Sequence, residues 1–292
     1  MQDTERDDPR FAELDLWDTD TMLAALWRGQ QDAVAALGPA LPDLARAVEA
    51  ALPRLSAGGT LAYAGAGTSG RIGAQDASEL NPTFDWPEDR IAVLMAGGER
   101  AFLRAVENAE DREDEAREAV ARAGLGPRDV LVGLAASGTT PFTVAAVQAA
   151  RSRGSLTVGI ACSAGAPLLA AAEIGVLTAT GPEAIAGSTR MKAGTAQKVA
   201  LNLFSTALMV RMGRVYRGRM VDMNARNTKL ERRAARMLAE LTDAPEAAVR
   251  DALAKAGGKV KLAVLILDGL DPVEAAARLA QHGGHLRSAR GF

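Results

Sequence analysis

Two short turns of the sequence combine glycine with hydroxyl side chains. The stretch GAGTSGR contains Thr68 and Ser69, and the stretch ASGTTPF contains Ser137, Thr139 and Thr140. Glycines let backbone N–H groups converge and hydroxyls add donors, so each turn could bind an anion or the hydroxyls of a sugar. One such turn could be an ordinary connection between a strand and a helix. Two of them, each after an apolar run, indicate a phosphorylated ligand.

A third stretch, GSTRMKAGTAQK at 187–198, could bind an anion at the start of a long helix. Ser188 and Thr189 are of the types that cap helices, and Arg190 and Lys192 add positive charge. Cations in the first turn of a helix interact unfavourably with the helix dipole. A bound anion at the same place would compensate for this cost. The alternative is a basic helix face in solvent.

Two glutamates could supply proton-transfer chemistry. Glu79 lies in ASELNPTF, where we expect Pro82 to end a helix and apolar neighbours to surround an acid. Glu110 lies in a strongly acidic stretch that we expect to be helical. The alternative to a catalytic role is therefore that Glu110 is a charged residue on a solvent-exposed helix face. Glu79 follows Ser69 by ten residues, about 15 Å along a straight helix. Either that helix is short and bent, or the two residues serve sites on different subunits.

Cysteine and histidine give weaker signals. Cys162 is the only cysteine, so no internal disulfide can form, and we expect it to be buried at the end of a strand. His282 and His285 have no cysteine partner nearby, and a helix cap and loop is the expected role for them. No metal site is therefore predicted.

The composition narrows the class of protein. The chain has 292 residues, of which 48% are hydrophobic and 24% charged, as in soluble globular proteins. A net charge of -2 gives no field to attract nucleic acid or an anionic membrane. The first residues are polar and acidic, unlike a signal peptide, and no apolar run is long enough to cross a membrane. We predict a cytoplasmic protein with no nucleic-acid or membrane partner.

Short apolar runs alternate with helical patterns along the middle of the chain. This alternation predicts an α/β fold with a doubly wound, five-stranded parallel sheet, in which ligands bind beyond the carboxyl ends of the strands. The expected strands are 60–65, 90–98, 129–137, 155–162 and 173–180. The expected helices of this region are 70–80, 99–123, 141–153 and 190–212.

The flanking segments are expected to be helical, which divides the chain into three ranges. Residues 1–57 form an N-terminal segment with helices that pack on the sheet domain, with Asp18 or Thr19 capping the first. Residues 58–225 form the sheet domain. Residues 226–292 form a small helical subdomain, because only helical periodicity remains there.

Taken together, these motifs resemble the sugar isomerase (SIS) fold, a five-stranded parallel sheet that binds phosphosugars. More closely, the chain is similar nearly end to end to the N-acetylmuramic acid 6-phosphate etherase family. The motifs that carry the resemblance are TERDDPRFAELD, GAGTSGRIGAQDASE, MAGGERAF, AVENAEDRED, GLAASGTTPF, GSTRMKAGTAQKVALN, GRVYRGRMVDMNARNTKL and QHGGHLR.

The resemblance implies a reaction. The family cleaves the D-lactyl ether at C3 of its substrate, giving N-acetylglucosamine 6-phosphate and D-lactate in cell-wall sugar recycling. A base removes the C2 proton of the open-chain aldehyde, the lactyl oxygen leaves C3, and water adds back. No metal or organic cofactor is needed. The resemblance makes Glu79 the proton donor and Glu110 either the base or a group that sets the charge of the first glutamate.

The spacing of Ser69 and Glu79 leads us to favour a homodimer with shared active sites. The resemblance in turn implies binding roles. Ser137, Thr139 and Thr140 would hold the phosphate, and Thr68 and Ser69 would lie near the sugar. We also count Ser188 of the third stretch among the candidate residues for binding substrate or phosphate. We add the hypothesis that Arg190 or Lys192 meets the lactyl carboxylate.

The sequence departs from the family pattern at a few positions. Thr139 replaces an expected arginine, and Leu80 and Asn81 replace an expected Cys-Pro pair. A non-catalytic phosphosugar sensor and an aldose–ketose isomerase are the alternatives, besides a lyase acting on another 3-ether sugar phosphate. Glu79 and Glu110 favour the etherase, because a sensor would need neither and an isomerase has no leaving group to protonate.

Overall fold

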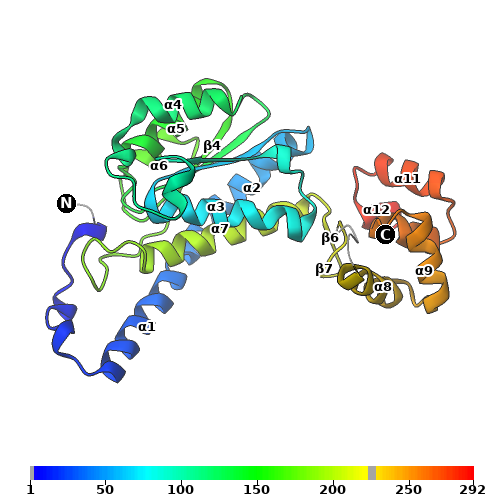
Figure 1. Ribbon diagram of the computed structural model, residues 1–292, viewed down its shortest axis with the longest axis horizontal. Helices are drawn as coiled ribbons and strands as arrows, with labels where there is room; N and C mark the ends of the chain where they lie inside the picture. Colours follow the sequence, from blue (N-terminus) through cyan, green and yellow to red (C-terminus); the bar gives the residue numbers. More distant parts are fainter. Residues whose placement is uncertain (1–2, 223–227) are drawn as a thin grey trace. The chain divides into compact units, whose positions relative to one another are not determined.

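The computed structural model describes residues 3–222 and 228–292 (Figure 1). Its centre is a sheet of five strands, all parallel, in the order β2-β1-β3-β4-β5. Every residue of β1, β3 and β4 is buried, as expected for a sheet covered on both faces. The five strands predicted from the sequence are confirmed: β1 Leu61–Gly65, β2 Ile91–Met95, β3 Val130–Leu134, β4 Leu156–Ala161 and β5 Ile174–Leu177.

Helices cover both faces of this sheet, so the doubly wound fold is confirmed. Figure 1 shows α4, α5 and α6 on one face and α2, α3 and α7 on the other. The first group is α4 Glu113–Arg122, α5 Pro141–Ser152 and α6 Pro167–Ala171, and the second is α2 Leu41–Ser56, α3 Gly67–Phe84 and α7 Lys192–Arg211.

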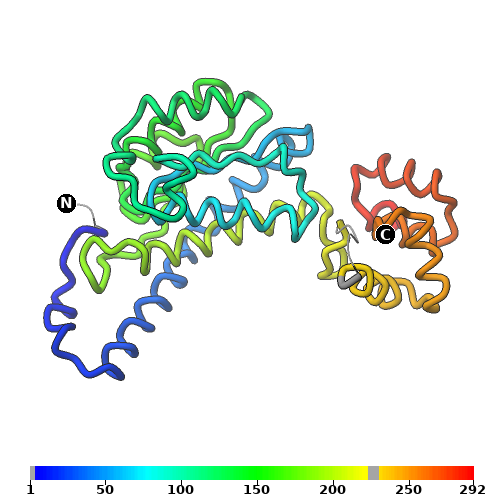
Figure 2. The backbone as a smooth tube through the Cα atoms, in the orientation of Figure 1, coloured from blue at the N-terminus to red at the C-terminus, as the bar shows by residue number. Residues whose placement is uncertain are grey.

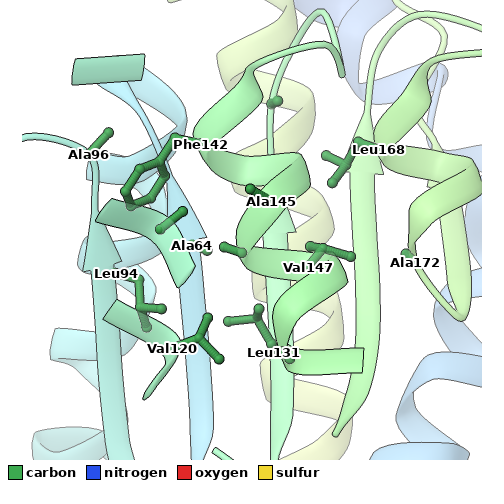
Figure 3. Close-up of a cluster of buried hydrophobic side chains, with 14 of the residues drawn as sticks. Ala64, Leu94, Ala96, Val120, Leu131, Phe142, Ala145, Val147, Leu168 and Ala172 are labelled. Atoms are coloured by element: carbon green, nitrogen blue, oxygen red, sulfur yellow. The ribbon is translucent and has the colours of Figure 1, made fainter. Parts of the chain in front are cut away.

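The core between the sheet and the first group of helices is built mainly of small aliphatic side chains (Figure 3). Phe142 and Val147 of α5 and Leu131 of β3 all belong to this core, and all three are almost fully buried. Burying a side chain of this size contributes about 1.5–3 kcal/mol. Alanines fill most of the remaining positions, which fits the aromatic content of 4%.

The junction between β1 and α3 depends on two glycines. A Cβ atom on Gly70 would overlap the sulfur of Met95 and would lie 2.7 Å from the carbonyl oxygen of Gly65. A Cβ atom on Gly65 would lie 2.8 Å from the backbone nitrogen of Gly70. Only glycine fits this close approach of strand and helix, and the approach places Thr68 and Ser69 at the carboxyl end of β1.

Three helix predictions differ from the structure. The segment 99–123 is not one helix, because it contains the 3₁₀ turns η6 Glu99–Phe102 and η7 Ala109–Asp111 before α4 begins. Asn108 has a left-handed backbone, with φ of 57°, and this ends any helix before η7. The helix α3 does not end at Pro82 but continues to Phe84. The short helix α6 was not predicted.

The N-terminal segment has more order than its polar sequence suggests. It forms three 3₁₀ turns, η1 Asp3–Glu5, η2 Pro9–Phe11 and η3 Leu14–Leu16, followed by the helix α1 Thr19–Ala35. Asp18 is the N-cap of α1, because its carboxylate accepts the backbone N–H of Thr21 at 2.9 Å. A further 3₁₀ turn, η4 Gly38–Ala40, leads into α2.

The last part of the described chain is helical, as predicted, with a core that includes Leu238, Val249 and Val264. A capping box between Asp271 and Glu274 begins its fourth helix. Residues 223–227, which are part of the motif GRVYRGRMVDMNARNTKL, lie outside the described residues. The elements are β6 Val215–Tyr216, β7 Arg219–Met220, α8 Thr228–Thr242, α9 Glu246–Lys255, α10 Val260–Leu267, α11 Pro272–Gln281 and α12 Leu286–Ala289.

The chain divides into two compact units that interleave along the sequence. One contains Met1–Ser78 and Glu88–Thr206, and the other contains Glu79–Pro87 and Ala207–Phe292. In the second unit, Trp86 is fully buried and the guanidinium of Arg214 lies 5.0 Å from its ring centroid. The three ranges 1–57, 58–225 and 226–292 stay a prediction about domains.

Candidate active site

A cavity of about 440 Å³ lies beyond the carboxyl ends of β1 and β3. These strands are neighbours, and the chain leaves them toward opposite faces of the sheet, through α3 and α5. Ligands of doubly wound sheets bind at such a point. The described residues that line the cavity are Glu5, Ala66, Gly67, Thr68, Ser69, Glu110, Asp111, Ala136, Ser137, Thr139, Thr140, Pro141, Gly187 and Thr189.

The structure brings together the two hydroxyl turns that the sequence singled out. Thr68, Ser69, Ser137, Thr139 and Thr140 all line this cavity. The second turn is organised internally, because the Ser137 and Thr139 hydroxyl oxygens lie 3.1 Å apart and the backbone N–H of Thr139 donates to Ser137 Oγ at 3.2 Å. Both turns lead directly into helices, whose first N–H groups have no partner within the helix.

Ser69 is held by a residue that the sequence analysis missed. Its hydroxyl donates to Gln197 Oε1 at 2.9 Å, and Gln197 is fully buried on α7. With its proton engaged by Gln197, Ser69 Oγ offers lone pairs to the cavity and would accept a hydrogen bond from a ligand hydroxyl. Gln197 gave no sequence signal, because a glutamine in AGTAQKVALN looks like any helical residue.

Glu110 lies at the cavity, but not on the helix that we expected. It belongs to the 3₁₀ turn η7, and it is exposed there beside Asp111. Both carboxylates line the cavity together with Glu5 of the N-terminal segment. Within the described part of the chain, no lysine or arginine is among the lining residues. The cavity walls of one chain therefore carry negative charge alone.

Glu79 does not line this cavity within the described residues. It is exposed on α3, and the buried apolar side chain beside it belongs to Leu80. Because α3 runs unbroken from Gly67 to Phe84, the suggestion of a short helix between Ser69 and Glu79 is wrong.

The third stretch is arranged differently from the expectation. The carboxylate of Glu183, itself buried, accepts the backbone N–H groups of Lys192 and Ala193, each at 2.9 Å. Glu183 therefore caps α7, and the side chains of Ser188 and Thr189 do not. A carboxylate of the chain itself therefore lies at the start of α7, where we expected an external anion.

The basic residues of this stretch do not reach the cavity in one chain. The ammonium of Lys192 is buried and donates to the carbonyl oxygen of Thr180 at 2.9 Å. Arg190 is exposed and Ser188 is half-buried. None of the three is among the described lining residues, so their proposed contacts with substrate stay predictions.

A buried polar cluster supports the helix that carries Glu79. Asp76 on α3 accepts hydrogen bonds from the Tyr63 hydroxyl at 2.8 Å, the Ser205 hydroxyl at 3.0 Å and the Asn202 amide at 3.2 Å. Burial raises the pKa of the Asp76 carboxyl group, and burial also raises the pKa of Tyr63 well above its usual value. The cluster joins α3 to β1 and α7, so it fixes the direction of α3.

The other reactive side chains have structural surroundings. Cys162 is buried after β4 as predicted, and burial raises the pKa of its thiol to about 11. His282 follows the end of α11 and His285 precedes α12. Over the described ranges, no three histidine, cysteine or acidic side chains are grouped to hold a metal ion. Over the same ranges, no helix is long and apolar enough to cross a bilayer.

Comparison with known proteins extends the likeness over the whole chain. The SIS domain model matches residues 113–207, and that of the glucokinase regulatory protein N-terminal SIS domain matches residues 43–151. An N-acetylmuramic acid 6-phosphate etherase of Deinococcus radiodurans is 52% identical, over 99% of this chain and 95% of that protein. Etherases of Streptomyces avermitilis and Cronobacter sakazakii are 46% and 45% identical over 98% of the chain, and over 92% and 97% of their own lengths. With this identity over nearly its full length, the chain belongs to the N-acetylmuramic acid 6-phosphate etherase family.

Proposed function

We propose that the protein cleaves the C3 ether of N-acetylmuramic acid 6-phosphate, giving N-acetylglucosamine 6-phosphate and D-lactate. The observation that carries this proposal is the cavity in which two hydroxyl turns meet Glu110, in a chain of the etherase family. The protein is then a carbon–oxygen lyase acting in cell-wall sugar recycling. A cytoplasmic location is supported by Cys162, which is single and buried and forms no disulfide.

The phosphate would be held by neutral donors. Ser137, Thr139 and Thr140 lie at the start of α5, where backbone N–H groups and the helix dipole favour an anion. Thr139 stands where the family resemblance led us to expect an arginine, in keeping with a cavity whose described lining residues include no cation. The negative walls near Glu110 would then face the sugar.

The reaction divides into proton transfers that the glutamates can perform. A base, for which Glu110 is the candidate, removes the C2 proton of the open-chain aldehyde. The C2–C3 double bond forms as the C3–oxygen bond breaks, and the leaving lactyl oxygen takes a proton from an acid. Water then adds at C3 and a proton returns to C2. We assign the acid to Glu79.

The position of Glu79 supports a site shared between two copies of the chain. Ser69 and Glu79 are ten residues apart on the unbroken helix α3, about 15 Å along its axis. A second copy also has a surface to dock on, because Leu23, Trp27 and Val34 of α1 are 59%, 62% and 49% exposed. Their spacing of four and seven residues places them on one side of that helix. We therefore propose a homodimer in which each Glu79 serves the partner's cavity.

Mixing two inactive variants tests the shared site. Glu79→Gln and Glu110→Gln chains, mixed and allowed to exchange subunits, should recover up to about a quarter of wild-type activity, because half the dimers are then hybrid and each has one intact site. Lactate release is the assay, and sedimentation gives the mass of the assembly. No recovery in hybrids of proven composition, or a fully active monomer, would place both glutamates in one chain's site.

The reaction itself is tested by proton NMR in heavy water. Wild-type protein given N-acetylmuramic acid 6-phosphate should release free D-lactate and leave deuterium at C2 of the product, because C2 is deprotonated during the reaction. C2 exchange without lactate would point to a sugar phosphate with another 3-substituent. Bound substrate with neither exchange nor lactate would contradict the lyase and indicate a sensor.

A further inference from the structure

The N-terminal segment reaches the cavity and is anchored there. Thr4 is fully buried, and its carbonyl oxygen accepts the backbone N–H of Gly187 at 3.3 Å. Figure 2 shows the first described residues beside the loop that precedes α7, although more than 180 residues separate Thr4 from Gly187 in sequence. The residue that follows Thr4 is Glu5, which lines the cavity together with Gly187.

The loop leaves room for the Glu5 carboxylate because Gly187 has no side chain. A Cβ atom on Gly187 would lie 3.1 Å from Glu5 Oε2, tighter than most such contacts. Gly187 also has a φ of 73°, which other residues rarely adopt. The hydrogen bond from Gly187 to Thr4 fixes the backbone next to Glu5, and the missing side chain of Gly187 leaves room for the Glu5 carboxylate at the cavity wall.

Charge decides which part of a phosphosugar Glu5 can contact. A carboxylate only accepts hydrogen bonds, so it cannot bind a phosphate dianion and would repel one nearby. Glu110 and Asp111 line the same cavity, and the hydroxyl turn at 137–140 offers donors. A ligand therefore fits with its phosphate at that turn and its uncharged hydroxyl or amide groups toward the carboxylates.

We propose that Glu5 is a substrate-binding residue that accepts hydrogen bonds from the hydroxyl or amide groups of the sugar. This inference rests on the proposed function, because it concerns the same cavity and the same phosphosugar. It makes the N-terminal segment a part of the active site. Charge-assisted hydrogen bonds of this kind are stronger than neutral ones, so the loss of one should be measurable.

Binding of two ligands to matched variants tests the proposal. Glu5→Gln and Glu5→Ala are compared with Glu13→Gln, which changes an exposed glutamate of the same segment outside the cavity. Calorimetry measures affinity for N-acetylglucosamine 6-phosphate and for inorganic phosphate. We expect the Glu5→Ala substitution to lower the affinity for N-acetylglucosamine 6-phosphate about 10- to 100-fold. Inorganic phosphate should bind the Glu5→Ala variant as tightly as it binds wild type, or more tightly, because a repelling charge is gone. The Glu13→Gln variant should have the wild-type affinity for both ligands.

The steady-state constants give a second readout. Glu5→Gln should raise KM more than it lowers kcat, since it loses ligand affinity and keeps the proton-transfer groups. Unchanged sugar-phosphate affinity in both Glu5 variants would overturn the proposal, and an equal loss for both ligands would show a general disturbance of the site instead. If wild type binds the sugar phosphate but releases no lactate, the proposed function fails while the binding comparison still decides on Glu5. If wild type binds no sugar phosphate, both fail.

Discussion

Replacing Glu79 by glutamine is expected to slow D-lactate release by about 10²- to 10⁴-fold, the contribution of a positioned general acid. The lactyl oxygen leaves poorly as an alkoxide, so it must be protonated as the C3–oxygen bond breaks. Glutamine keeps the shape of glutamate and cannot donate that proton. Because Glu79 is exposed in one chain, the substitution should leave folding unchanged. Deuterium exchange at C2 should continue, since a different group removes that proton.

The matched control is Glu88→Gln, which changes an exposed glutamate in the 3₁₀ turn η5, Glu88–Arg90. Lactate release by this variant should equal that of wild type. Lactate and C2 deuterium are followed in the same NMR sample, so the two proton transfers are separated. If Glu79→Gln released lactate at the wild-type rate, the acid would have to be another group.

Replacing Asp76 by alanine is expected to lower the free energy of unfolding by about 3 kcal/mol or more, since each buried donor left without a partner costs about 1–3 kcal/mol. Three donors would lose their acceptor: the hydroxyls of Tyr63 and Ser205 and the amide of Asn202. Single domains are stable by only about 5–15 kcal/mol, so this is a large share. Denaturant unfolding followed by circular dichroism measures it.

Two further variants separate the carboxylate from the packing around it. Ser205→Ala removes one donor and should cost less than Asp76→Ala. Asp76→Asn keeps the shape but does not ionise. Because burial raises the pKa of Asp76 in the folded protein, its protonated form stabilises the fold, and that stability is lost as the pH rises through the folded pKa. The stability advantage of wild type over Asp76→Asn should therefore shrink with rising pH, and an advantage that grew would contradict the raised pKa.

The sheet could be predicted from sequence because its signal is local. Short aliphatic runs, each followed by glycine or hydroxyl residues, indicate buried parallel strands, and β1 and β3 have that form. The helix ends were harder to predict where a single residue determines whether the helix continues. Asn108 takes a left-handed backbone that composition does not reveal, whereas Pro82 is accepted within α3 despite the usual preference.

The residues of the candidate site could likewise be predicted where the signal is local in the sequence, and not where it depends on distant contacts. The hydroxyl turns were found because they come directly after strands, whose ends must meet at one edge of a sheet. Glu5 and Gln197 were missed, because their roles depend on contacts with Gly187 and Ser69, far away in the sequence. The roles of Glu79, Arg190 and Lys192 stay predictions, because none of the three is among the described residues that line the cavity of one chain.

The capping of α7 by Glu183 affects whether a free anion can bind at the start of this helix. A carboxylate attached to the chain is a built-in counter-ion, present at a constant effective concentration. Free phosphate would have to displace this carboxylate to bind at the start of α7, so we expect weak phosphate binding at this helix terminus. The helix starts at α3 and α5 border the cavity and stay open to an incoming anion. Of these three helix starts, we therefore expect substrate and inorganic phosphate to compete at those of α3 and α5.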